Sequence, residues 1–224
     1  MINLKSNEQR AKIAIIFLWI ILVLELITLA SNIMQFFCLK NYQEGITSIN
    51  ELESNDLRVQ VIAYTYIIVY VGCATIFIMW FRRAYNNLHL KGIHLNYDES
   101  WASGSWFVPI MNFIRPYQIM KELYFETKNK LNLSVNVNEN QLNTTFVGIW
   151  WTLWVIISIL GQIEYRMPSE TIDHFVNSTL VGIIGNFLGI PTAYFAIKVI
   201  KDYSEVEPLL LNENEDIINQ IGKF

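Results

Sequence analysis

Glu25 is the residue whose type and position are chemically most unusual, because it lies near the middle of an apolar stretch. A carboxyl group at the centre of a membrane costs about 2.5–3.5 kcal/mol, so it should face other helices and bind a polar partner. Counting from the ends of the apolar stretches places Tyr70 and Asn186 at a similar depth. Three interpretations follow: a hydrogen-bonded lock between helices, a proton relay or ion site, or a side chain that extends toward water.

A second polar group follows the second apolar stretch. Arg82 and Asn86 are four residues apart and therefore share one helical face, with Arg83 beside them. These side chains could bind the phosphate of lipid headgroups. Alternatively, they anchor the helix at the inner membrane surface and pair with Glu122 or Glu126.

The sequence contains no pattern that predicts catalysis. It has no Ser-His-Asp, HExxH, Cys-His or glycine-rich phosphate-binding motif, so we expect no catalytic residue, no cofactor and no enzyme activity. The spacing of His89, His94 and Asp98 does not suit one helical face, so we expect no metal site. Cys38 and Cys73 lie at depths too different for a disulfide.

Four apolar stretches are long enough to hold these residues in a membrane, since about 20 apolar residues cross roughly 30 Å of hydrocarbon as a helix. The stretches cover residues 11–38, 59–81, 145–165 and 175–200. Of the 224 residues, 53% are hydrophobic and 16% are charged. The net charge of −4, without a basic stripe, argues against a nucleic-acid partner. We therefore predict an all-α fold, an integral membrane four-helix bundle that forms a single domain over residues 1–224.

Positive charge predicts the orientation. With both termini in the cytoplasm, 13 of the 16 Lys and Arg residues lie on the cytoplasmic side of the four stretches. The positive-inside rule selects this topology. The seven Trp residues agree with it, because all of them fall in the inner half of the spans or in the long cytoplasmic loop.

The long loop contains a module, residues 99–128, that we expect at the inner membrane surface. Its apolar segment 101–114 has 14 residues, too few to span, and Gly104, Pro109 and Pro116 divide it. The segment should dip into the inner leaflet or lie along its surface.

An amphipathic helix on the cytoplasmic side should start at Pro116. Its apolar face recurs at helical spacing and consists of Ile119, Met120, Leu123 and Tyr124. This face could lie in the membrane interface or pack on the end of the bundle. Residues 129–143 are rich in asparagine and predict a flexible linker, and residues 203–224 predict a solvated acidic tail.

Small residues line one face of the fourth apolar stretch. Gly185 and Gly189 would let another helix approach closely, either within the protomer or in a homo-oligomer. Pro191 predicts a kink in the same helix.

The loop sequence also resembles a known family. Its features are the stretch from Trp80 to Asn87, the stretch from Trp101 to Asn112, and Arg115-Pro116-Tyr117. This order of tryptophans, prolines and arginines resembles the bacterial family of unknown function numbered 4328. The resemblance implies a multi-span membrane protein of bacterial origin, and it implies no activity. Asp98-Glu99-Ser100 departs from the neutral turn expected there.

Together, these patterns predict a non-catalytic protein of the bacterial inner membrane, a scaffold or sensor that uses its cytoplasmic face. Its partners would be membrane lipids and a protein at that face. The alternative is a small transporter or ion or proton channel that uses Glu25 and the dipping segment. The candidate functional residues are Glu25, Tyr70, Arg82, Arg83, Asn86, Trp106, Pro109, Asn112, Arg115, Pro116 and Asn186.

Overall fold

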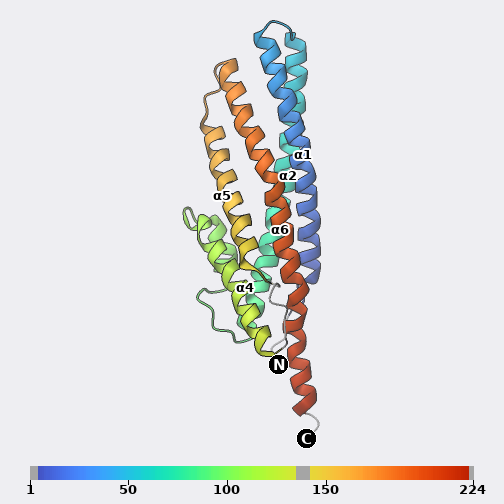
Figure 1. Cartoon of the computed structure of the whole chain (residues 1–224), viewed down its shortest axis with the longest axis vertical. Helices are drawn as coiled ribbons and strands as arrows, with labels where there is room; N and C mark the ends of the chain where they lie inside the picture. Colours follow the sequence, from blue (N-terminus) through green and yellow to red (C-terminus); the bar gives the residue numbers. More distant parts are fainter. Residues whose placement is uncertain (1–4, 135–141, 222–224) are drawn as a thin grey trace. The chain divides into compact units, whose positions relative to one another are not determined.

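The structure, a computed structural model, describes residues 5–134 and 142–221, with the side chains of 5–131 and 142–210. These residues form helices and no strand. Within this described part, four helices are long and apolar enough to cross a membrane. They are α1 (Glu8–Gln43), α2 (Ile49–Leu90), α5 (Thr144–Arg166) and α6 (Ile172–Ile221) (Figure 1). The predicted all-α class and the four apolar helices are confirmed.

Local sequence signals define where α1 ends and α2 begins. Gly45 has a positive φ of 72°, which lets the chain leave α1 with its amide bonded to the carbonyl of Tyr42. Ser48 and Glu51 then form a capping box: the Ser48 amide donates to the Glu51 carboxylate at 2.8 Å, and the Ser48 hydroxyl accepts from the Glu51 amide. The turn between these two helices is therefore fixed by local chemistry.

The chain forms two compact units. Unit 1 takes in the described parts of Met1–Ile16, Ala74–Ile149 and Phe195–Phe224, and unit 2 consists of Phe17–Cys73 and Trp150–Tyr194. Because α1, α2, α5 and α6 each contribute to both units, each unit is built from short pieces of several helices.

An aromatic core holds unit 1 together. The rings of Trp80 and Tyr203 meet edge to face at 6.0 Å, and Tyr124 stacks on Tyr203 at 6.0 Å. Tyr124 belongs to α4 (Arg115–Ser134), and its hydroxyl donates to the backbone carbonyl of Val199 in α6. The predicted apolar face of α4 is fully buried in this core. This burial favours packing on protein over an exposed position in the membrane interface.

The segment that precedes α4 is broken into short pieces. It contains α3 (Trp101–Gly104), η1 (Ser105–Phe107) and η2 (Met111–Phe113). Pro109 lies between the two 3-10 turns, and Ile110 has a positive φ of 67°. The segment therefore does not form a continuous helix, as Pro109 and its short length predicted. Gly104, the other predicted breaker, has helical angles of φ −68° and ψ −32°, and α3 runs directly into η1 there.

Two helices extend into regions where the sequence predicted flexible chain. Helix α4 continues to Ser134, inside the expected linker 129–143, whose residues 135–141 lie outside the described part. Helix α6 continues to Ile221, through most of the expected tail 203–224, of which residues 222–224 are not described. For α6, the sequence contains an apolar face that favours a helix up to Leu210, since Tyr203, Val206 and Leu210 follow helical spacing and are buried.

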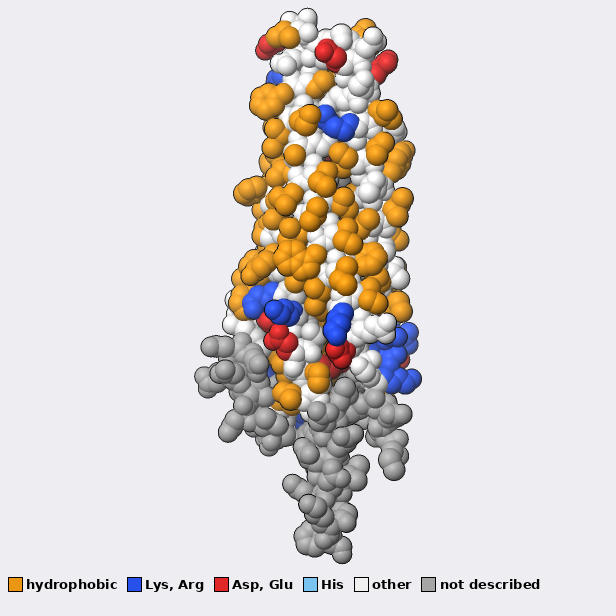
Figure 2. Space-filling model, turned by 90° about the vertical axis from the view of Figure 1, so that its right-hand side faces the viewer, with side chains coloured by type: hydrophobic (Ala, Val, Ile, Leu, Met, Phe, Trp, Pro, Cys, Tyr) orange, Lys and Arg blue, Asp and Glu red, His pale blue; other side chains and the backbone are white. Residues whose placement is uncertain are grey.

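Pro191 does not end α6, which runs through it as one helix. On the face drawn in Figure 2, hydrophobic side chains cover much of the helical surface and charged ones are sparse among them. This surface suits hydrocarbon as a solvent.

Candidate functional site

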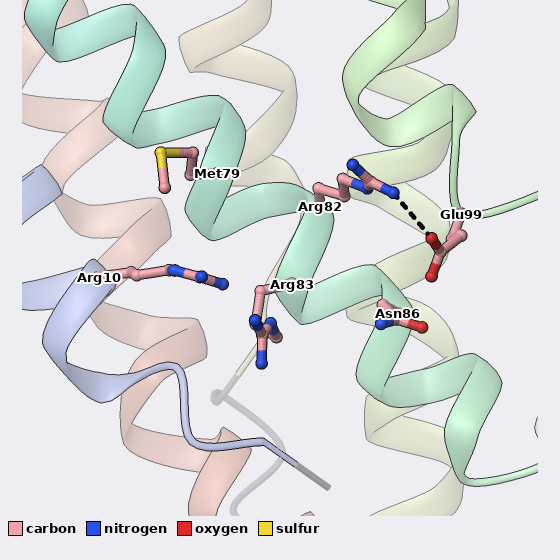
Figure 3. A pocket seen from close by; sticks show the side chains of 6 residues that line it. All are labelled: Arg10, Met79, Arg82, Arg83, Asn86 and Glu99. Carbon is pink, nitrogen blue, oxygen red and sulfur yellow. Dashed lines mark hydrogen bonds and ion pairs between the residues drawn. The ribbon is translucent and has the colours of Figure 1, made fainter.

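Three of the predicted residues come together in a pocket of unit 1. Arg82, Arg83 and Asn86 lie on consecutive turns of α2 and line a cavity of about 330 Å³ (Figure 3). Arg10, Met79 and Glu99 complete its lining. We call these six residues the basic pocket.

The basic pocket holds three guanidinium groups and one carboxylate. Arg82 points toward Glu99 and pairs with it at 3.0 Å, while Arg10 extends toward Arg83 (Figure 3). The sequence had suggested Glu122 or Glu126 for this pairing; Glu122 instead accepts from Tyr85, at 2.6 Å. Within the described part of the chain, neither Arg10 nor Arg83 makes an ion pair. The pocket therefore carries an excess of positive charge.

The electrostatics of Arg83 reflect this excess. The pKa of Arg83 is lowered, most strongly by its partial burial and then by the positive charges of Arg10 and Arg82. The negative charges of Glu207 and Glu99 oppose this shift. The repulsion between the guanidinium groups would be relieved by an anion in the pocket. Phosphate oxygens are the acceptors that suit guanidinium donors best, because two parallel hydrogen bonds can form.

A buried polar cluster holds Arg10 in place. The Asn7 amide donates to the carbonyl of Trp80 at 3.1 Å, and the Asn87 amide donates to the carbonyl of Lys5 at 3.1 Å and to Glu207 at 2.8 Å. These bonds tie the chain before α1 to α2. They thereby position the first turn of α1, which carries Arg10, next to the arginines of α2.

Glu207 is the acid of this cluster and lies past Lys198 and Lys201, beyond the apolar stretch 175–200. Only 3% of it is exposed. Burial raises the pKa of Glu207 to about 7, against the opposing effects of Asn87, Asn7 and Arg83. Its carboxyl therefore titrates near neutral pH.

The other predicted residues of unit 1 do not line the basic pocket. Trp106 packs edge to face on Phe77 at 5.7 Å, and its indole N–H donates to the carbonyl of Ala102. The Arg115 guanidinium lies 4.6 Å from the ring centre of Tyr97. The remaining three, Pro109, Asn112 and Pro116, belong to the broken segment and the first turn of α4.

A second polar cluster lies in unit 2 around Glu25, which is only 6% exposed. The Tyr66 hydroxyl donates to one carboxyl oxygen at 2.6 Å, and the Asn186 amide donates to the other at 2.9 Å. Asn32 in turn donates to Asn186 at 2.8 Å. Asn186 is one of the two partners suggested by depth.

The tyrosine partner differs from the one that the sequence suggested. Tyr66, one helical turn before Tyr70, bonds Glu25, whereas the Tyr70 hydroxyl accepts from the Trp154 indole. The two tyrosine rings stack with their centres 6.0 Å apart. Counting residues from the end of an apolar stretch thus predicts the depth of a side chain to within about one helical turn, which is 5.4 Å long.

Sequence reasoning missed several residues of both clusters. The sequence predicts no role for Arg10 beyond its part in the cytoplasmic positive charge, and it places Glu207 within the acidic tail 203–224. A signal for Glu207 was present, because Tyr203, Val206, Glu207 and Leu210 share one helical face.

The long apolar helices and the polar clusters between them indicate an integral membrane protein of the helical class. The chain belongs to the family described as Domain of unknown function (DUF4328), whose model matches residues 44–205. The resemblance noted from the loop sequence is thereby confirmed. No curated protein and no solved structure matches the chain.

Proposed function

We propose that this protein is a non-catalytic scaffold or sensor of the bacterial inner membrane, whose cytoplasmic face binds the phosphate of anionic lipid headgroups. The observation that carries the proposal is the basic pocket, which three arginines and one carboxylate line and in which the carboxylate pairs with Arg82 alone. Anionic lipids are concentrated at the cytoplasmic surface, where arginines bind them.

The position of Met79 favours a lipid over free phosphate. Met79 lies in the last turn of the apolar stretch 59–81, lines the basic pocket and is 49% exposed. A lipid could place its phosphate on Arg10 and Arg83 and its first methylenes on Met79. Free phosphate would use only the arginines.

The broken segment supports the same role. Phe107 and Ile110 are 77% and 75% exposed, although both are large and apolar. Such side chains are costly in water and stable in the acyl region of a leaflet. Glu99, the first residue of the module, lines the basic pocket and pairs with Arg82 there. The module would thus insert beside bound lipid.

Lipid binding can be tested in nanodiscs. The double variant Arg10→Gln/Arg83→Gln should lose at least about tenfold in affinity for phosphatidylglycerol over phosphatidylcholine, since each tenfold corresponds to only about 1.4 kcal/mol. Bound lipid would be measured by native mass spectrometry. Lys121→Gln is the matched control, because Lys121 is an exposed cation of unit 1 outside the pocket.

Two results would contradict the proposal. One is an equal loss in the Lys121 control, which would mean that overall charge, not the pocket, attracts the lipid. The other is full displacement of phosphatidylglycerol by millimolar inorganic phosphate, which would identify free phosphate as the ligand.

Topology and insertion can be tested together by cysteine labelling in a background with Cys38→Ala and Cys73→Ala. Ser48→Cys should react with a water-soluble maleimide in intact cells, and His94→Cys only after permeabilisation. Ile110→Cys should resist that reagent in both states and react with a membrane-permeant one, because lipid covers it. Labelling of His94→Cys in intact cells would refute the orientation, and labelling of Ile110→Cys by the water-soluble reagent would refute insertion.

A further inference from the structure

Unit 2 contains a polar cavity of about 280 Å³, bordered by parts of α1, α2, α5 and α6. Glu25 and Glu164 are its two carboxyl groups, and Asn32, Tyr66 and Asn186 are among its other polar residues. Most of the cavity lies within apolar stretches, where polar walls are costly unless they bind something.

Three glycines on one face of α6 locate the open space between the two carboxyl groups. A Cβ atom on Gly189 would collide with the Glu25 carboxyl, and one on Gly182 would lie 3.2 Å from Oε1 of Glu164. A Cβ atom on Gly185, between them, would have no neighbour within 4 Å. Because Gly182 and Gly189 are seven residues apart, the carboxyl groups are separated by about 10 Å along the helix.

Among the polar atoms that line this cavity, hydrogen-bond acceptors outnumber the donors that have no partner. Tyr66 uses its only donor on Glu25, Asn186 uses one of its two amide hydrogens on Glu25, and Asn32 uses one of its two on Asn186. The Thr28 hydroxyl donates to the carbonyl of Leu24 at 2.8 Å. The two carboxyl groups, with the hydroxyl and amide oxygens beside them, offer more acceptor sites than the remaining N–H groups can use, so an occupant should be a donor of hydrogen bonds.

A positively charged donor suits this site better than a metal ion. The described residues include no group of three or more His, Cys, Asp or Glu side chains that could hold a metal. A primary ammonium group carries one positive charge and donates three hydrogen bonds. Arg58 lies next to the cavity wall, because its guanidinium donates to the hydroxyl and the carbonyl of Ser31, which lines the cavity.

Negative charge around the cavity entrance outweighs the positive charge of Arg58. Glu164 is exposed, whereas Glu25 is enclosed, so the cavity opens at the Glu164 end. The two connections of unit 2 near that end, residues 39–58 and 164–175, carry seven acidic and three basic residues. Such an excess of negative charge raises the local concentration of cations.

We propose that this cavity binds a short linear diamine, with one ammonium group on Glu25 and the other on Glu164. In a diamine with an extended chain of four carbons, the two nitrogens are about 6 Å apart. A hydrogen bond of about 2.8 Å at each end then lets the molecule span the distance of about 10 Å between the two carboxyl groups. Ile62 and Leu160, which line the wall, would contact the methylenes.

The test uses the full chain in nanodiscs, with 1,4-diaminobutane as the probe and 1-aminobutane as the singly charged comparison, at constant ionic strength. Isothermal titration calorimetry should give saturable binding of the diamine, at least tenfold tighter than that of the monoamine. Glu164→Gln, which removes one carboxylate, and Gly185→Leu, which fills the open space, should each weaken the diamine at least tenfold.

Glu170→Gln is the matched control, because it removes an exposed carboxylate from the same connection without touching the cavity. Its diamine affinity should equal that of the wild type. Neither Glu164→Gln nor Gly185→Leu removes a hydrogen bond of the Glu25 cluster, so both should fold, which the unfolding temperature checks. The proposal is overturned by an absence of saturable binding, by equal affinity for the monoamine, or by unchanged diamine affinity in both cavity variants.

Discussion

We expect Gly189→Ala to lower the free energy of unfolding by about 3 kcal/mol, although it adds a single methyl group. The new Cβ would occupy the place of the Glu25 carboxyl. Glu25 would have to leave Tyr66 and Asn186, and each hydrogen bond to such a group contributes about 1.5–3 kcal/mol. Reversible unfolding in mixed micelles measures the loss.

Two comparisons separate this effect from general helix packing. Gly185→Ala, one turn away, has open space for its Cβ and should be neutral or slightly stabilising, because alanine favours helix more than glycine. In a Glu25→Ala background the cost of Gly189→Ala should nearly vanish, since the colliding group is gone. An equal cost in both backgrounds would show that the carboxyl is not the obstacle.

The second large effect concerns pH. Because the pKa of Glu207 is about 7 in the folded protein and its ordinary value is 4.5, the folded state holds this proton between those two pH values while the unfolded state has released it. Stability from this group is fully present below pH 4.5 and decreases as pH rises through 7. At about 1.4 kcal/mol per unit of pKa, the loss reaches about 3 kcal/mol.

Glu207→Gln should remove this part of the pH dependence, since the glutamine carbonyl can still accept from Asn87 and does not ionise. Glu205→Gln is the matched control, because Glu205 is exposed and two residues away. Unfolding measured from pH 4.5 to 8 should show a smaller decline for the Glu207 variant than for the wild type and the Glu205 variant. Identical slopes for all three proteins would refute the assignment.

The parts of the fold that the sequence predicted are those that depend on one helix at a time. The length and apolar content of each stretch are enough to identify the four long helices. The spacing of Arg82 and Asn86 is likewise enough to place both side chains on the same pocket. Pro109 and the short length of 101–114 predicted that this segment does not form a spanning helix.

What the sequence did not reveal depends on contacts between distant segments. Arg10 joins the basic pocket only because Asn7 and Asn87 fix the chain before α1 against α2. The rotation of α2 decides that Tyr66, and not Tyr70, faces Glu25, and depth counting carries no information on rotation. The charged residues after Lys201 suggested solvated chain, and concealed the apolar face that continues α6.

The distance in sequence between Glu25 and its partners sets an order of events during biogenesis. Tyr66 follows Glu25 by 41 residues, but Asn186 follows it by 161. The ribosome therefore releases α1 with a carboxyl whose second partner is not yet synthesised. Once α2 is made, the first two helices can form a hairpin joined by the Glu25–Tyr66 bond, and the arrival of α6 then completes the carboxyl's hydrogen bonds.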